Sequence, residues 1–474
     1  MLFFLSHLAL TLACAVHVLL RPHRQPESRA AWLLMLVAFP YLGVLAYLLL
    51  GTTNIGRRRA ARLSAIARAL PRPETAPGWP MAQALADADD APLFRLGTSI
   101  SGYPAVGGNR AELMADSDAA IDHLVADIDA AAHSVHLIFY IWLDDRNGRR
   151  VAEALRRAAG RGVACRALVD DLGSRAFIRS AQWPALAGAG VRVLRALPVG
   201  NPLLRALRGR IDLRNHRKLV VIDNRLTYCG SQNCADPAFL PKAKYGPWVD
   251  VFLRFEGPVV RQNQHLFATD WMGHGGDDLT ALLAEPMPPA SHGFAAQVIA
   301  TGPTDRAAAM PELFESLIYA ARRELVITTP YYVPVPALQA ALCAAANRGV
   351  SATLILPARN DDFAVGATSR SHYRALLEAG VRLHEFGPGL LHAKTITIDG
   401  HLSLIGSANM DRRSFDLNYE NNILVRDEAL TAALHARQAH YLASSRRITL
   451  DDVVAWGAGR RLWQNTLAIV GPIL

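Results

Sequence analysis

The stretch His216-Arg-Lys218-Leu-Val-Val-Ile-Asp223 decides the fold, because its pattern returns as His392-Ala-Lys394-Thr-Ile-Thr-Ile-Asp399. In both copies a second polar cluster follows after six residues, Gly230-Ser231-Gln-Asn233 in the first and Gly406-Ser407-Ala-Asn409 in the second. A pattern of this length with identical spacing indicates that the chain contains an internal duplication.

The framework around the two motifs repeats as well. Each half begins with an apolar run, Ser134 to Trp142 in the first and Glu324 to Tyr332 in the second, followed by an alanine-rich helical stretch. Apolar runs that alternate with stretches of helix length are typical of α/β units around sheets covered on both faces. We therefore predict two similar α/β sandwich domains, residues 93–290 and 291–474, with matching loops facing each other.

Two apolar segments precede this region. Residues 1–20 carry no Asp, Glu, Lys or Arg, and residues 30–50 form a second uncharged run. At a rise of about 1.5 Å per residue the second run covers roughly 31 Å, enough to cross a bilayer core. We predict a transmembrane hairpin over residues 1–51 and a linker over 52–92. A cleaved signal peptide and a buried soluble hairpin are the alternatives.

The charge distribution bears on topology and partners. Six arginines follow the second apolar run between residues 57 and 72, so the positive-inside rule predicts that the catalytic part lies in the cytoplasm. The whole chain carries 50 basic and 41 acidic residues, a net charge of +9, which suits an anionic membrane, a phosphorylated substrate or nucleic acid. The five cysteines form no C-x-x-C pair, which argues against a disulfide framework and a thiolate zinc site.

The residue types in the motifs indicate phosphodiester chemistry. Lys218 and Lys394 can neutralise phosphate oxygens, and Asn233 and Asn409 can donate to them. One imidazole, of His216 or His392, could attack phosphorus while the other serves as acid and then base. These built-in cations make a metal ion or another cofactor unnecessary.

The remaining motif residues have structural explanations to weigh. Asp223 and Asp399 complete the catalytic motif, but each lies beyond an apolar run, so a structural salt bridge is the favoured role. Gly230 and Gly406 are expected to be turn residues that permit close approach of the backbone before Ser231 and Ser407. The run from Pro202 to Arg210 could rest on an anionic membrane or form an ordinary surface helix.

The duplicated motif resembles that of the phospholipase D superfamily, over nearly all of the chain after the linker. The two apolar segments, with Tyr47-Leu-Leu-Leu-Gly51, and the run Asp411-Arg-Arg-Ser-Phe415 are similar to bacterial cardiolipin synthases. The resemblance implies an integral protein of the bacterial inner membrane that condenses two phosphatidylglycerol molecules into cardiolipin and glycerol. It also implies that Asp250 and Glu420 orient the histidines, and that His216 is the nucleophile and His392 the general acid.

Four alternatives remain open at this point. A hydrolytic phospholipase D or another phosphatidyltransferase would use the same residues, and a nuclease of the superfamily would suit the positive charge. The membrane hairpin disfavours nucleic acid, because a lipid substrate explains an anchor. A non-catalytic scaffold that binds anionic lipid is disfavoured by two complete motifs.

Overall fold

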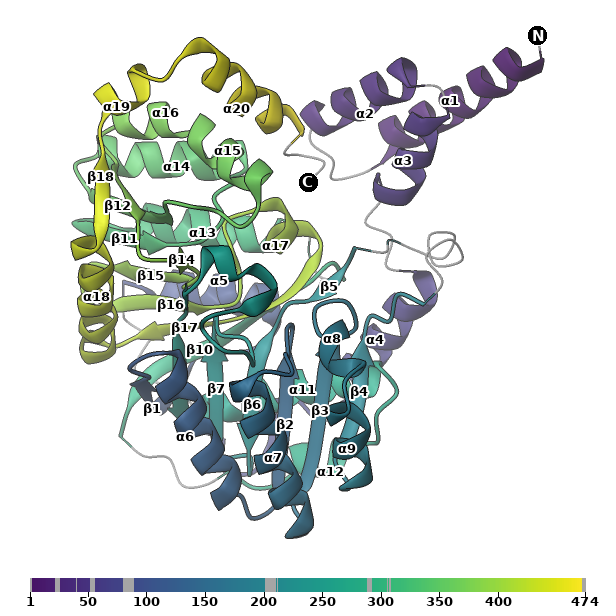
Figure 1. Ribbon diagram of the computed structural model, residues 1–474. Coiled ribbons are helices and arrows are strands. Elements are labelled where there is room, and N and C mark those ends of the chain that lie inside the picture. Colours follow the sequence, from purple (N-terminus) through teal and green to yellow (C-terminus); the bar gives the residue numbers. More distant parts are fainter. Residues whose placement is uncertain are drawn as a thin grey trace.

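A computed structural model describes residues 2–21, 26–39, 41–51, 56–79, 89–200, 210, 212–287, 292–304, 306 and 308–470. Most of these residues form one body built on a continuous sheet, and three N-terminal helices project from it (Figure 1). The helices are α1 (Leu2–Leu20), α2 (Pro26–Ala38) and α3 (Leu42–Leu50).

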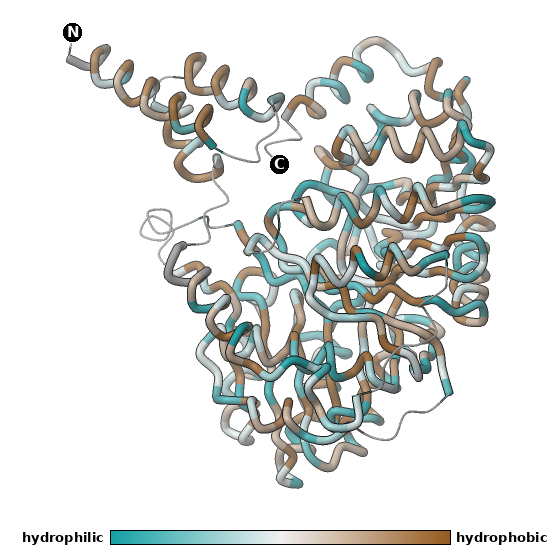
Figure 2. The backbone as a smooth tube through the Cα atoms, turned by 180° about the vertical axis from the view of Figure 1, so that it is seen from behind, coloured by the Kyte–Doolittle hydropathy of each residue, from teal (hydrophilic) through white to brown (hydrophobic). Residues whose placement is uncertain are grey.

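Most residues of the three N-terminal helices are hydrophobic (Figure 2). A small core of Trp32, Leu36, Val44 and Tyr47 joins them, while many leucines on all three helices stay exposed. The second predicted run is divided between α2 and α3, and the sequence has a proline at position 40, a residue that interrupts helical hydrogen bonding. Within the described ranges no helix is both long and apolar enough to cross a bilayer, so the transmembrane hairpin stays a prediction.

The sheet displays the duplication directly. From one edge to the join its strand order is β4-β3-β2-β6-β7-β9-β1, and from the join to the other edge it is β10-β17-β16-β15-β11-β12-β13, with β18 added outside. The halves meet where β1 pairs antiparallel with β10, Val106 opposite Ala296. The bounds in the first half are β1 Val106–Leu113, β2 Ser134–Phe139, β3 Ala164–Asp170, β4 Arg192–Ala196, β6 Lys218–Ile222, β7 Leu226–Gly230 and β9 Phe252–Glu256.

The second half follows the same order with its own strands. Its first strand, β10, pairs antiparallel with β17, as β1 pairs with β9 in the first half. The bounds are β10 Phe294–Thr301, β11 Glu324–Thr328, β12 Ser351–Pro357, β13 Arg382–Phe386, β15 Thr395–Ile398, β16 Leu402–Gly406, β17 Asn418–Arg426 and β18 Ser445–Ile448.

Strand alternation divides the apolar side chains among three layers. In β2, Val135 and Leu137 join an outer core with α6 (Ser117–Ala130) and α7 (Arg146–Gly160), whereas Ile138 joins the central core. In β11, Leu325 joins the second outer core with α13 (Ala309–Ala320) and α14 (Pro336–Asn347), and Val326 joins the central core. The halves therefore share one central core, which contains side chains of α11 (Val259–Gly273) and α18 (Glu428–Ala443).

One helix departs from the simple division into halves. The helix α5 (Ala91–Ser101) precedes the first half in sequence, yet Leu93 and Phe94 lie in the outer core of the second half. Gln297 of β10 donates to the carbonyl oxygen of Phe94 at 3.0 Å. The start of the first predicted domain therefore packs on the second half.

Candidate active site

Two short crossing strands bring the motifs together. The strand β5 (Arg214–Asn215) pairs in parallel with β17 of the other half, and β8 (Trp248–Val249) pairs in parallel with β14 (Leu390–Leu391). The backbone N–H of His216 donates to the oxygen of Tyr419 at 2.9 Å, and that of His392 donates to Val249 at 2.8 Å. Tyr419 precedes Glu420, and Val249 precedes Asp250. These backbone contacts therefore place each histidine next to an acidic residue of the opposite half.

Both acids predicted to orient the histidines contact them across the two halves. His216 Nδ1 lies 2.9 Å from Glu420 Oε2, and His392 Nδ1 lies 2.6 Å from Asp250 Oδ1. Both histidines and both acids are buried. A carboxylate at Nδ1 fixes the tautomer and leaves Nε2 as the reactive nitrogen.

The serines of the two motifs hold these carboxylates in place. Ser231 Oγ donates to Asp250 at 2.6 Å, and Ser407 Oγ donates to Glu420 at 2.5 Å. The glycine before each serine is needed for close approach, because a Cβ at Gly230 would lie 2.2 Å from the oxygen of Val251 and one at Gly406 would lie 2.4 Å from that of Asn421. Neither glycine has a positive φ, so close approach and not a turn explains them.

The two lysines lie at the same site. Lys218 Nζ and Lys394 Nζ each donate at 2.6 Å to the carbonyl oxygen of the histidine two residues earlier. Burial lowers the pKa of Lys218 to about 7 and that of Lys394 to about 8, against the attraction of Glu420 and Asp250. Each ammonium also lowers the pKa of the histidine in the other motif, so the charges of the two halves act on one another.

The histidines favour the neutral form. Burial lowers the pKa of His216 to about 4, although Glu420 raises it, and Lys218 and Lys394 lower it further. Burial and both lysines likewise lower the pKa of His392. Burial raises the pKa of Glu420 and Asp250, but the facing histidine and lysines outweigh it, so both acids stay ionised. The arrangement supplies two neutral imidazoles, each fixed by a carboxylate, beside two cations.

Several arginines adjoin or precede His216 in the sequence, and positive charge near an imidazole favours its neutral form. Arg205 and Arg208 lie outside the described residues, as does most of the run from Pro202 to Arg210. Arg217 Nη1 pairs with Asp270 of α11 at 2.6 Å, and Arg217 Nε donates to the backbone oxygen of Glu420 at 3.1 Å. The repulsive charges that lower the histidine pKa values are the lysines.

The last motif residues, Asp223 and Asp399, serve the backbone. Asp223 accepts from the N–H groups of residues 132, 133 and 134 at 2.7–2.8 Å, and Asp399 accepts from those of 322, 323 and 324 at 2.8 Å. No salt bridge to either carboxylate occurs in the described part of the chain, so the expected ion pairs are replaced by backbone contacts. Both aspartates have positive φ and turn the chain after the motif strand.

The two motif asparagines differ in their contacts. Asn233 Oδ1 accepts from the N–H of Ile141 at 3.2 Å, which leaves its amide N–H₂ as the donor. Asn409 donates its backbone N–H to Ser414 Oγ at 2.9 Å, and its buried Oδ1 has no hydrogen-bond partner among the described residues. In the same ranges no cluster of three His, Cys, Asp or Glu residues could hold a metal ion.

Aromatic rings complete the site. Tyr140 packs edge-on against His216 with ring centroids 4.8 Å apart, and Trp248 lies 4.7 Å from His392. Sequence analysis did not select Trp248. Its position two residues before Asp250 is the signal that could have identified it, because side chains two residues apart in an extended segment lie on the same side.

A duplicated α/β sheet with two carboxylate-bound histidines and two buried lysines at one site defines a phospholipase D-like phosphatidyltransferase. The family model described as "Cardiolipin synthase, PLD-like domain" matches residues 124–270 and 314–441, and "Phospholipase_D-nuclease N-terminal" matches residues 9–51. The chain belongs to the cardiolipin synthase family.

Individual proteins agree with this assignment. The chain is 38% identical to cardiolipin synthase A of Escherichia coli over 464 residues, which cover 94% of this chain and 92% of that protein. The crystal structure of phosphatidylserine synthase from Haemophilus influenzae has a TM-score of 0.59 at 14% identity and covers 81% of this chain and 100% of that one. At that identity the second match supports the fold alone.

Proposed function

We propose that this enzyme condenses two phosphatidylglycerol molecules into cardiolipin and glycerol through a phosphohistidine intermediate. The observation that carries the proposal is the crossed pairing of His216 with Glu420 and of His392 with Asp250, beside Lys218 and Lys394. Membership of the cardiolipin synthase family supports the choice of substrates.

The first step transfers the phosphatidyl group to the enzyme. Nε2 of one neutral imidazole attacks phosphorus, the bond to the glycerol headgroup breaks, and the second histidine, which enters the step as the imidazolium with a proton on Nε2, donates that proton to the leaving alkoxide. Lys218 and Lys394 neutralise the phosphate oxygens, with Asn233 and Asn409 as further donors. In the second step the same histidine removes the proton of the hydroxyl of another phosphatidylglycerol, which attacks the phosphohistidine and forms cardiolipin.

We assign the nucleophile to His216 and the general acid to His392. A neutral imidazole is required for attack, and the pKa of His216, lowered to about 4, supports this role. The contact of His392 with Asp250 is the shorter of the two, 2.6 Å against 2.9 Å, as charge-assisted hydrogen bonds are. That geometry favours an imidazolium on His392 when a proton is supplied.

The proposal includes the domain organisation and the membrane anchor. The repeated strand order supports two phospholipase D-like domains over 93–290 and 291–474, after an anchor over 1–51 and a linker over 52–92. Exposed leucines along α1, α2 and α3 support contact of this anchor with the acyl chains of the cytoplasmic membrane. We propose a two-span arrangement with the catalytic part in the cytoplasm.

The topology can be tested in intact cells of a bacterial host. With two spans, a cysteine introduced as Gln25→Cys reacts with a membrane-impermeant maleimide from outside, and the chain resists extraction by alkaline carbonate. Release of the chain by carbonate, or labelling only after lysis, would contradict the two-span arrangement.

The reaction is tested by supplying the purified full-length enzyme with phosphatidylglycerol alone and identifying the products by mass. We expect cardiolipin and glycerol in equal amounts. Phosphatidic acid with glycerol would instead indicate a hydrolytic phospholipase D. Retention of phosphatidylglycerol without any turnover would favour a lipid-binding scaffold.

A further inference from the structure

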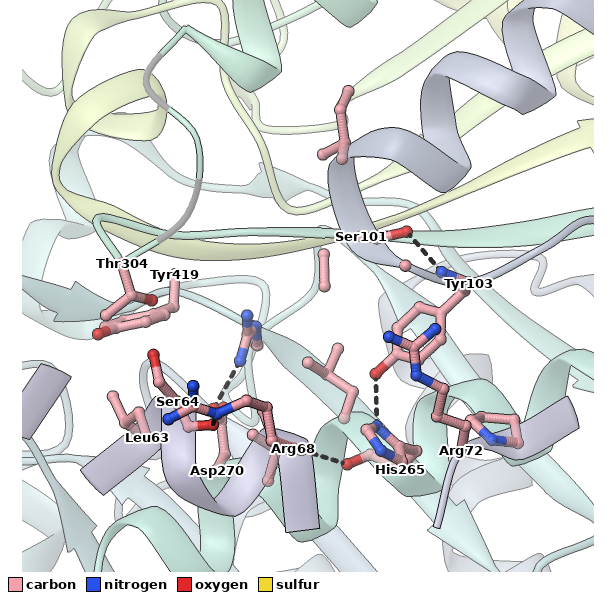
Figure 3. A pocket seen from close by; sticks show the side chains of 18 of the residues that line it. Leu63, Ser64, Arg68, Arg72, Ser101, Tyr103, His265, Asp270, Thr304 and Tyr419 are labelled. Atoms are coloured by element: carbon pink, nitrogen blue, oxygen red, sulfur yellow. Dashed lines mark hydrogen bonds and ion pairs between the residues drawn. The ribbon is translucent and has the colours of Figure 1, made fainter. Parts of the chain in front are cut away.

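A cavity of about 370 Å³ lies behind the first motif, on the side of the strands to which Arg217 points. Helix α4 (Arg57–Ala69) and the segment after it form one wall, and α11 forms another (Figure 3). Arg217 and Tyr419 close the cavity toward the active site. Its volume is in the range of small-molecule sites.

One buried ring nitrogen in this cavity has no hydrogen-bond partner among the described residues. His265 of α11 lines the cavity and is 7% exposed, and its Nδ1 lies 2.9 Å from the hydroxyl of Tyr103 (Figure 3). When that hydroxyl donates to Nδ1, the neutral ring carries its proton on Nε2. Nε2 is buried and has no partner among the described residues, an arrangement that costs free energy unless a ligand accepts from it.

The charges around the cavity leave an excess of guanidinium. Asp270 is compensated by Arg217 at 2.6 Å and by the amide of Asn215 at 2.8 Å. Oε1 of Glu74 lies 3.5 Å from Arg72, whose side chain is 67% exposed, whereas the buried Oε2 of Glu74 has no hydrogen-bond partner among the described residues. Arg68 donates to the oxygen of Ser64 at 3.2 Å, and over the described ranges no carboxylate pairs with it.

We propose that this cavity binds the phosphate group of a phosphate ester separate from the reacting lipids, with Arg68, Arg72 and the Nε2–H of His265 as donors. Guanidinium groups and a buried N–H donor are the partners that phosphate oxygens prefer. Leu63, Ile100 and Leu266 supply an apolar wall for the glycerol part of a headgroup. The site goes beyond the transfer reaction and does not depend on it.

The position of the cavity indicates where its ligand could come from and what it could influence. Helix α4 begins six residues after Gly51, the end of the predicted membrane anchor, so a phospholipid headgroup is one source and a free phosphate ester is the other. Arg217 forms part of the wall and also holds the backbone oxygen of Glu420, whose carboxylate orients His216. A phosphate bound in the cavity would therefore be separated from Glu420 by the side chain of Arg217.

Hydrogen–deuterium exchange of the full-length enzyme in detergent tests the site with inorganic phosphate as the probe. We expect phosphate to slow exchange in peptides that cover residues 61–75 and 260–274. Any protection of the two catalytic motifs by phosphate is measured separately, in the peptides that contain His216 and His392. Arg68→Gln and His265→Phe should weaken this protection about tenfold, whereas His265→Gln, which retains an N–H donor, should preserve it. Arg374→Gln, on a surface ion pair with Glu378, is the matched control.

Nanodiscs distinguish the two sources. Protection by phosphatidylglycerol but not by phosphatidylcholine, with loss in Arg68→Gln, would support a lipid headgroup, and protection by free phosphate alone would support a soluble ester. No protection by any probe, or protection that persists unchanged in both Arg68→Gln and His265→Phe, would overturn the site. None of these outcomes would affect the proposed transfer reaction, because that reaction is tested separately by identifying its lipid products.

Discussion

The two halves of the molecule have the same strand order and the same motif, yet they differ at the residues that surround each histidine. His216 faces Glu420 and Tyr140, whereas His392 faces Asp250 and Trp248. The residue between histidine and lysine is Arg217 in the first half and Ala393 in the second. Only the first motif is therefore fixed from behind by a buried ion pair.

The difference shows that the duplication produces one site and not two. The acid that fixes each histidine comes from the opposite half, and the crossing strands β5 and β8 set that exchange. Neither half contains a complete histidine–carboxylate pair of its own. We therefore expect the two motifs to fail together and to differ only in the order in which they act.

The largest expected effect is the loss of either histidine. His216→Ala and His392→Ala should each lower the rate of cardiolipin formation by about 10⁴-fold or more, and the double variant should be no slower, because the two act as a unit. The rate is measured by mass spectrometry of the lipid products. His435→Ala, which removes a half-exposed histidine paired with Glu324, is the control. Substantial activity in either single variant would contradict the claim that the two histidines act as a unit.

The next effect tests the crossed carboxylates. Glu420→Gln and Asp250→Asn should each lower kcat by about 10²- to 10⁴-fold with a smaller change in KM, since loss of the carboxylate frees the imidazole tautomer. Asp129→Asn removes a surface partner of Arg157 and should leave kcat unchanged. A variant of either acid that behaves like this control would refute the orienting role in that half.

The ion pair behind the first motif should affect stability more than its surface equivalents do. Arg217→Met leaves the buried carboxylate of Asp270 without its guanidinium partner and should cost about 3–5 kcal/mol of stability, whereas the double variant Arg217→Met/Asp270→Met should cost less. Arg150→Met, which breaks a surface pair with Asp122, should cost about 0–1 kcal/mol. Thermal and denaturant unfolding of the three variants measure this, and equal losses for the single and double variants would contradict the account.

Deprotonation of the lysines should lower kcat/KM about tenfold per pH unit on the alkaline side of the pH profile. With a pKa of about 7 for Lys218 and about 8 for Lys394, both are charged below pH 7 and lose their protons as the pH rises through 7 to 8. The value of kcat/KM should therefore fall above pH 7, in addition to the loss caused when the general acid His392, whose pKa is lowered, releases its proton at lower pH, while the acid limb lies near pH 4, where His216 becomes protonated.

A permanently charged side chain separates this loss from other titrations. Lys218→Arg should shift the alkaline limb upward, and Lys244→Arg, a change at an exposed lysine that lies over the ring of Tyr245, should not. An unshifted alkaline limb in Lys218→Arg would assign it to a different group.

Local patterns predicted much of this structure. The duplication, the α/β class, the motif residues and the identity of the two acids could all be predicted from spacing and from the resemblance to phospholipase D. Which acid serves which histidine could not, because it depends on the pairing of β5 with β17 and of β8 with β14, and periodicity carries no information on register between distant segments.

Other features were missed for the same reason. Nothing in the sequence of α5 indicates that Leu93 and Phe94 pack on the second half, and nothing near Arg217 identifies Asp270 as its partner. The glycines before Ser231 and Ser407 were predicted correctly as sites of close approach, since that requirement acts within a short segment.

The order of action of the two motifs is tested most directly by trapping the covalent intermediate. Full-length enzyme is mixed with phosphatidylglycerol, quenched rapidly without acid, digested, and its peptides are mapped by mass spectrometry. The account predicts a phosphatidyl adduct on the peptide that contains His216, and none on the peptide that contains His392. An adduct on His392 alone would reverse the assignment, and turnover with no adduct on either histidine would contradict the two-step mechanism itself.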